Sequence, residues 1–508
     1  MISCRHLGWL LLLLALCGCT RKPASNELVV IIESNPNNLD PRVGIDAQSE
    51  RIGELIFDAL VHRDDHFNLQ PWIAESWDIP DPLTYVFHLR HDVKFHDGRP
   101  LTSKDVKWTL DTIAQGKIRS TKTATFKYVD HIDVRDDFTV VIHLKEPYSA
   151  LLWNLSSGAI GIVPEGADDK FGTKPIGTGQ FKFVSAEQDK DVLIERNDQY
   201  WGEKAKVKDV RFIVVPDPTT RALELRKGSA DISPPGSLNP DMYVALKNEP
   251  TIREIQEPGT VLAYIAMNVR DPILKDVRVR QALAYAIDRD PLIHYLWRDQ
   301  ARPANSVLPP QHWAYNGDVP TYAHNPAKAR ELLQAAGYPE KNGVRFHLTM
   351  KTSTEESTRL LAAVLQQQLR EVGIVLDIRS FEFATFFSDV QKGAFQFYSL
   401  RWIGGNQDPD IFEYVFDSSR TPPKGANRGF YSNPKVDALI AQGRKEIDRE
   451  KRKQIYFEVQ RIVAEDLPYI NLWYFDNVIA YRPRVKGLKL VPSGNFEFLR
   501  EAEIAPED

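Results

Sequence analysis

Cysteine is scarce in this sequence, and its three cysteines all fall within the first nineteen of 508 residues. Beyond Cys19 the chain has no thiol with which to form a disulfide bond, attack a substrate or bind zinc. A chain without disulfide bonds has to be stabilised by burial of apolar side chains. Hydrophobic residues make up 43 % of the sequence and aromatic residues 10 %, which is ample for two or three domains.

Strong net charge and long apolar runs are also lacking. The formal charge of −5 is small for a chain of this length, and no basic patch predicts a nucleic acid partner. After the N-terminal segment, no apolar stretch approaches the roughly twenty residues needed to span a bilayer. The hydrolase signatures Gly-x-Ser-x-Gly and His-Glu-x-x-His are absent. A pair of catalytic carboxylates is not excluded, because 69 acidic residues offer many combinations.

Histidine spacing predicts no metal site. His62 and His66 are spaced so that a helix would place both imidazoles on one face, but the sequence between them is typical of a turn. His88 and His91 are three residues apart on a strand and its exit, so they point to opposite faces. We therefore expect neither a metal ion nor another cofactor.

The N-terminal segment has the layout of a secretory signal peptide. One arginine precedes an apolar run of about ten residues, which is too short to cross a bilayer. The run ends in Leu16-Cys17-Gly18-Cys19, which resembles a bacterial lipobox. This resemblance implies a signal peptide over residues 1–18, lipid on Cys19 and a polar tether over 19–26. Acyl chains then hold the protein at a membrane, facing the periplasm or the cell exterior. The alternative is a simple signal peptide whose cysteines are incidental.

Strand-like and helix-like patterns alternate along the whole chain, which predicts a mixed α/β protein. Residues 28–32 and 374–378 are apolar runs typical of buried strands, and residues 85–90 alternate as in a half-buried strand. Asn-Pro pairs at 325–326 and 433–434 predict two helix starts, because asparagine caps a helix and proline fits its first position.

Several short segments stand in a specific order along nearly all of the chain after residue 26. They are 38–41 (Asn-Leu-Asp-Pro), 69–77 (Leu-Gln-Pro-Trp-Ile-Ala-Glu-Ser-Trp), 84–102, 176–179 (Ile-Gly-Thr-Gly), 200–201 (Tyr-Trp), 276–288, 325–338 and 467–470 (Leu-Pro-Tyr-Ile). Each segment alone is weak, but their order and spacing together are specific. In these segments the chain resembles family 5, the peptide/nickel class, of bacterial ABC-transporter solute-binding proteins.

The resemblance implies an α/β fold of the type II periplasmic-binding-protein kind. In such a fold two lobes are joined by strands that cross twice, and the ligand is held between the lobes as they close on a hinge. An extra α+β domain is also implied. On this sequence, lobe one comprises residues 27–58, 166–268 and 485–508, the extra domain residues 59–165, and lobe two residues 269–484.

The resemblance further implies a monomeric receptor that delivers a peptide-like ligand to an ABC permease in the membrane and is not an enzyme. Alternatives are the same role for a non-peptide solute, such as an oligosaccharide, an opine-like compound or a metal chelate, and a role in signalling. A secreted hydrolase is the alternative from another class.

One segment should identify the ligand most directly. In the peptide-binding branch of the family, a segment of the form Trp-x-x-Asp-Asn-x-Asp-Pro lies in the cleft, and its first aspartate pairs with the amino terminus of the ligand. Here the segment spans residues 402–409, with Gly405 in the place of that aspartate. Loss of one partner of a buried charge pair costs ~2–5 kcal/mol, which weakens amine capture of this kind. Either Asp408 contacts the ligand instead, or the ligand lacks a free amine. A helix cap ahead of Asp410 is the alternative role for Asp408.

The same segment supplies further ligand candidates. The resemblance places Trp402 in the cleft, where its flat ring can cover a peptide bond, with a core tryptophan as the alternative. Arg401 can hold a carboxylate, but strand alternation points it away from Trp402 unless the strand ends there. The remaining candidates are Asn406, Tyr264, Asn35 and Asn37. A core or turn role is the alternative for the last three of these.

Overall fold

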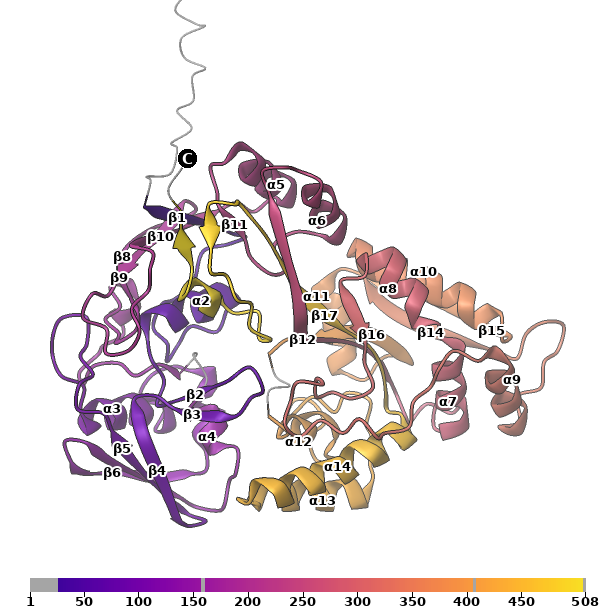
Figure 1. Ribbon diagram of the computed structural model, residues 1–508. Coiled ribbons are helices and arrows are strands. Elements are labelled where there is room, and N and C mark those ends of the chain that lie inside the picture. The colour runs from indigo at the N-terminus through magenta and orange to yellow at the C-terminus, as the bar shows by residue number, and fades with distance from the viewer. Residues whose placement is uncertain (1–25, 157–159, 405–407, 506–508) are drawn as a thin grey trace, which may run out of the picture.

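The computed structural model describes residues 26–156, 160–404 and 408–505. The predicted signal peptide, Cys19 and almost all of the tether lie outside these residues, as do Gly405 and Asn406. An eleven-stranded mixed sheet runs through both lobes (Figure 1). Its strands in spatial order are β15 (Ile374–Phe381), β14 (Phe346–Ser353), β16 (Phe397–Trp402), β12 (Arg253–Met267), β17 (Tyr469–Tyr481), β11 (Ile232–Ser233), β1 (Glu27–Ile32), β10 (Asp209–Val214), β9 (Asp191–Arg196) and β8 (Phe181–Glu187), with β13 (Ala301–Pro303) paired to β17.

Two of the helices that pack along this sheet begin at the predicted Asn-Pro pairs. Asn325 accepts a hydrogen bond from the backbone N–H of Lys328 at 3.0 Å, and Asn433 caps its helix in the same way. The helices of the two lobes are α2 (Ala47–Ile56), α5 (Pro218–Lys227), α6 (Pro240–Lys247), α7 (Val277–Ala286), α8 (Arg289–Trp297), α9 (Pro326–Ala335), α10 (Glu356–Arg370), α11 (Phe383–Gln391), α12 (Ile411–Phe416), α13 (Pro434–Lys445) and α14 (Arg449–Asp466). None of the described helices is long and apolar enough to cross a membrane.

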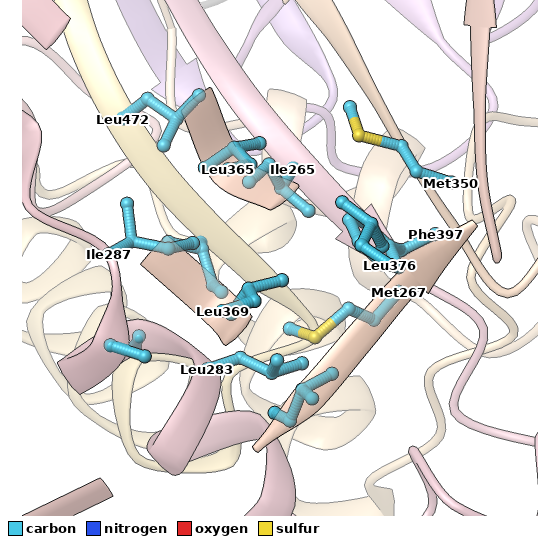
Figure 2. Close-up of a cluster of buried hydrophobic side chains, with 14 of the residues drawn as sticks. Ile265, Met267, Leu283, Ile287, Met350, Leu365, Leu369, Leu376, Phe397 and Leu472 are labelled. Atoms are coloured by element: carbon cyan, nitrogen blue, oxygen red, sulfur yellow. The ribbon is translucent and has the colours of Figure 1, made fainter. Parts of the chain in front are cut away.

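Lobe two is built on β14, β15 and β16, in which β14 is parallel to both neighbours. One end of β12 and one end of β17 complete this half of the sheet. Figure 2 shows Ile265 and Met267 of β12 and Leu472 of β17 packed with Leu365 and Leu369 of α10 in a buried core. Burial of each such side chain contributes ~1.5–3 kcal/mol, so this core holds β12 and β17 firmly against α10.

Lobe one contains the other half of the sheet. β1 is buried along its whole length, which confirms the strand predicted over residues 28–32. It pairs in parallel with β10 on one side and β11 on the other. Leu55 and Ile56 of α2 and Phe496 and Phe498 near the C-terminus pack onto this sheet. A short pair of strands, β18 (Val485–Lys486) and β19 (Glu503–Ile504), completes the lobe.

The extra domain is a separate antiparallel sheet covered on one face by α3. The order of its strands is β4-β5-β7-β6. Phe87 of β5 and Ile142 of β7 are fully buried in its core, which also contains Leu110 of α3. The elements of this domain are β2 (Val61–Arg63), β3 (Leu69–Pro71), β4 (Ala74–Asp81), β5 (Thr84–Leu89), α3 (Ser103–Ala114), β6 (Val129–Asp136), β7 (Thr139–Leu144) and α4 (Leu151–Asn154).

The extra domain contacts lobe two directly. The Tyr148 hydroxyl donates a hydrogen bond to the carboxylate of Asp410 at 3.1 Å. The backbone N–H of Ser149 donates to the carbonyl of Arg444 at 2.9 Å. These contacts join segments that the sequence separates by more than 250 residues, and they bring the start of α12 up to the extra domain (Figure 1).

Candidate ligand-binding cleft

The strands of the two lobes run toward each other along β12. β1 is parallel to β11, and both β11 and β12 are antiparallel to β17, so β1 runs in the same direction as β12. β16 is antiparallel to β12. The carboxyl ends of β1 and β16 therefore face each other. Ligands of open α/β sheets bind outside the carboxyl ends of the strands, so the space between these two ends is the candidate cleft.

Strand register gives the length of this gap. Through β11 and β17, Val30 of β1 is level with Arg253 of β12, whereas Trp402 at the end of β16 pairs with Leu262. Since β1 ends just beyond Val30, about seven residues of β12, or ~23 Å, separate the two strand ends. A gap of this length accommodates a short extended peptide. The pairing of β12 with β17 is irregular between Pro258 and Leu262, within the gap.

Trp402 stands at the lobe-two side of the cleft. Its ring is partly exposed and stacks on Tyr264, with centroids 5.9 Å apart and planes 13° apart. Tyr264 is fully buried and stacks on Tyr469 on its other side, with centroids 4.4 Å apart. Tyr264 thus packs between Trp402 and Tyr469, and it presents no surface of its own to the cleft.

Arg428 is a buried cation beside Trp402. Its guanidinium carbon lies 5.5 Å from the centroid of the Trp402 ring and 5.3 Å from that of Phe387. Its Nη1 donates to the hydroxyl of Tyr264 at 3.4 Å. Burial raises the pKa of this tyrosine well above its usual value, so the hydroxyl is neutral. Within the part of the chain that the structure describes, Arg428 is 8 % exposed, forms no ion pair with a carboxylate, and leaves its Nε without a hydrogen-bond partner.

Arg401 reaches the same strand end from the other face of the sheet. Its guanidinium carbon lies 5.1 Å from the ring centroid of Trp297 and 4.6 Å from that of Phe475. Its Nη2 donates to the hydroxyl of Ser357 at 3.4 Å. Arg401 and Trp402 are the last two residues of β16 and contact opposite faces of the sheet, and their placement in one cleft stays a prediction. Among the described residues Arg401 also forms no ion pair with a carboxylate, although Glu355 lies near enough to interact electrostatically.

Asp408 is engaged inside lobe two. Its two carboxylate oxygens accept hydrogen bonds from Nη2 and Nη1 of Arg452 at 2.7 and 2.9 Å. Its Oδ1 also accepts from the backbone N–H of Asp410 at 2.8 Å, just before α12. Asp408 therefore holds the turn before α12, whose N-cap is Asp410, and its role as a ligand contact or a helix cap stays a prediction. For Asp408 to contact a ligand, it would have to give up a bidentate ion pair whose arginine is buried.

The two asparagines predicted in lobe one follow β1 at its carboxyl end, on the opposite side of the cleft. The side chain of Asn35 donates to the carboxylate of Asp189 at 3.1 Å. Asn37 is exposed, and its backbone N–H donates to the side chain of Asp46, which caps α2, at 3.2 Å. Both residues border the gap, but their present partners belong to turns of lobe one.

A polar pocket of about 580 Å³, including its open side, lies between α2, the β2–β3 hairpin and the C-terminal segment. The hairpin belongs to the extra domain, so the pocket lies between that domain and lobe one, and we call it the lobe-one pocket after the lobe that contributes Glu54 and Glu497. Asn477 of the crossing strand β17 donates to the carbonyls of Val491 and Pro492, which line this pocket, at 2.9 and 3.0 Å. Arg63 in the pocket interacts electrostatically with Asp408 of lobe two. The pocket therefore lies beside the crossing strands and faces lobe two.

Glu54 carries the main electrostatic feature of the lobe-one pocket. Burial and the neighbouring Glu497 raise the pKa of Glu54 to about 8, although the guanidinium groups of Arg500 and Arg63 in the same pocket act in the opposite direction. Asn495 donates to its Oε1 at 2.6 Å, whereas its Oε2 has no hydrogen-bond partner among the described residues. The carboxyl is thus largely protonated at neutral pH, and a positively charged ligand group placed beside it would favour its ionised form. No pattern in the sequence distinguished Glu54 from the other acidic residues.

Residues 68–423 match the family model for "Bacterial extracellular solute-binding proteins, family 5 Middle". The chain belongs to this family. Family 5 proteins are extracytoplasmic receptors that bind peptides or other small solutes for ABC permeases. The predicted family and the type II periplasmic-binding-protein fold are confirmed, because solved family 5 structures superpose along the chain.

Relatives of this family 5 receptor have different named ligands. The chain is 31 % identical to the glutathione-binding protein GsiB of Pectobacterium atrosepticum over 489 residues, which cover 94 % of each chain. It is 26 % identical to the dipeptide-binding protein of Escherichia coli, covering 98 % of each chain. The crystal structure of NikZ from Campylobacter jejuni in complex with Ni(L-His) matches 94 % of this chain and 100 % of its own, with 28 % identity and a TM-score of 0.78.

Proposed function

We propose that this receptor captures a short peptide-like solute with at least one carboxylate in the cleft between lobes one and two, and presents it to an ABC permease. The observation that carries the proposal is the pair of guanidinium groups at the end of β16. In the described part of the chain, neither Arg401 nor Arg428 forms an ion pair with a carboxylate of the protein.

Arg428 is a buried cation without a counterion among the described residues, which is costly, and a ligand carboxylate would remove that cost. Arg401 is exposed, so no such cost applies to it. Arginine suits this role because its planar guanidinium can donate two parallel hydrogen bonds to one carboxylate. Arg428 lies against the ring of Trp402, so the same ligand would meet a cation and a flat apolar face together. Closure of the lobes would exclude water and strengthen the charge interaction.

The named ligands of the relatives support this chemistry. Glutathione and dipeptides both carry a free carboxylate, and glutathione carries two with one ammonium group. Because Gly405 replaces the aspartate that would hold the amine, we assign the amine to the lobe-one pocket, where Glu54 and Glu497 lie close together. In this arrangement each lobe holds one end of the ligand, and both contacts form only when the lobes close.

NikZ favours one second candidate, a metal–amino acid chelate, because its named ligand also presents a carboxylate.

We further propose that the receptor acts as a monomer and that Cys19 carries a lipid anchor. We also propose that the ligand leaves unchanged, as expected of a receptor that is not an enzyme. Trp402, Arg401, Asn35, Asn37 and Asn406 remain our proposed ligand contacts, whereas the structure gives Tyr264 and Asp408 internal partners.

Thermal unfolding of the protein without residues 1–19 tests the ligand class. Glutathione, dialanine and Ni(L-His) are compared, and a ligand at 100 times its Kd stabilises by ~2.7 kcal/mol. We expect stabilisation by glutathione or dialanine, and recovery of that ligand intact.

Arg428→Gln should weaken binding by about thirtyfold or more, since truncating a buried charge partner costs ~2–5 kcal/mol. Arg330→Gln, on the exposed face of α9, is the matched control. A response to Ni(L-His) alone, or full peptide affinity in Arg428→Gln, would overturn the proposal.

A further inference from the structure

We propose that the solvent-exposed face of the extra domain binds a divalent transition-metal ion through His131, Asp133 and His143. These residues lie on β6 and β7, where His131 is paired directly opposite His143. Asp133 is two residues further along β6 and so lies on the same face as His131. The alternate positions Ile132 and Ile142 are buried in the core. Strand register therefore gathers all three side chains at one exposed point, distant in sequence from every residue of the cleft.

The distances within this cluster suit a metal ion. The Oδ2 atom of Asp133 lies 3.6 Å from Nε2 of His131 and 3.4 Å from Nε2 of His143. Ligand atoms ~2.0–2.1 Å from a tetrahedral ion are ~3.3–3.5 Å apart, which is nearly the separation already present. The three ligand atoms all lie within 4.8 Å of one another. Because the side chains are exposed, small rotations suffice to close the set around an ion.

A fourth residue orients one of the ligands. The carboxylate of Asp130 lies 2.9 Å from Nδ1 of His131 and, as an acceptor, favours the tautomer with the proton on that nitrogen. That hydrogen bond leaves the lone pair on Nε2, which is the atom directed at Asp133. A carboxylate that fixes the tautomer of a histidine ligand in this way is typical of protein metal sites. The two imidazole rings are stacked 4.3 Å apart and 13° from parallel, so one ring has to rotate to bring both Nε2 lone pairs onto one ion.

The donor set selects the class of ion. Two imidazole nitrogens and one carboxylate favour Zn²⁺, Ni²⁺ or Cu²⁺, whereas Mg²⁺ and Ca²⁺ prefer sites made of oxygen alone. Three protein ligands also leave at least one coordination position for water or for a donor from another molecule. The sequence did not suggest this site, because the two histidines are twelve positions apart and only the β6–β7 register brings them together.

Zinc titration of the metal-free protein, prepared without residues 1–19 and without a polyhistidine tag, tests the site. We expect one zinc ion to bind, with NMR shifts of the His131 and His143 imidazoles, which need no variant. His131→Ala and His143→Ala should each weaken binding about tenfold or more, and Asp130→Asn about tenfold.

His88→Ala is the control, because His88 is an exposed histidine of the same sheet that is paired with Asp78 at 3.0 Å and lies outside the His131–Asp133–His143 cluster. It should bind zinc as the wild type does, and added Mg²⁺ should not compete. Unshifted His131 and His143 resonances at saturating zinc would overturn the proposal. So would equal zinc affinity in the wild type and the His131→Ala/His143→Ala double variant.

Discussion

Charged side chains in this protein are distinguished by their partners, and partners depend on tertiary structure. The sequence pointed to the segment around Trp402 and offered two roles for Asp408, but it did not reveal Arg452 as the partner of that aspartate. It also gave no reason to select Arg428 or Glu54. Their burial and the absence of a counterion for Arg428 in the described structure result from packing between segments far apart in the chain.

The Asp408→Asn substitution separates the two roles of that residue. The variant leaves Arg452, which is 3 % exposed, without its charge partner. Breaking a buried pair in this way costs ~3–5 kcal/mol, so urea unfolding should show a loss of that order. Glu458→Gln, which breaks two partly exposed pairs of the same helix, with Arg461 and with Lys435 of α13, should cost less than the Asp408 substitution, at about 1 kcal/mol. Wild-type stability together with lost peptide binding would instead make Asp408 a ligand contact.

Elements with strong local signals could be predicted, whereas their pairings could not. The caps at Asn325 and Asn433 fixed the starts of α9 and α13, and the apolar run at 374–378 became the first part of β15. The long antiparallel pairing of β12 with β17 joins residues about 200 apart, and no local pattern encodes its register. The cleft and the hinge depend on such pairings, whereas the histidine cluster depends on the register of the local β6–β7 hairpin.

Gly259 marks the irregular part of the crossing strands. A Cβ atom added there would lie 2.4 Å from the backbone oxygen of Phe475 in β17, which is too close for the two strands to keep their positions. We expect Gly259→Ala to destabilise the protein by about 1–3 kcal/mol and to weaken ligand-driven closure. Gly53→Ala, in α2 with no atom within 4 Å of the added Cβ, should instead be neutral or stabilise by up to ~1 kcal/mol. Equal effects of the two substitutions in thermal unfolding would contradict a tight approach of the strands at the hinge.

The two lobes of the molecule share a single sheet and face each other across the candidate cleft. The family and the fold could be predicted from the order and spacing of short motifs along the chain, because that combination is specific to the family. The contacts of Tyr148 and Ser149 with lobe two show the extra domain and lobe two already in contact. A receptor that closes on its ligand would gain further contacts of this kind at the expense of solvent in the cleft.

Small-angle X-ray scattering with and without a saturating ligand tests whether the lobes close on that ligand. The ligand is glutathione, or dialanine if that is the one found to bind. A compact chain of this length has a radius of gyration of about 23 Å. We predict that the radius is larger without ligand and falls when the ligand is added, while Arg428→Gln at the same ligand concentration shows no change. An unchanged radius in wild-type protein that calorimetry shows to be saturated would contradict capture by lobe closure.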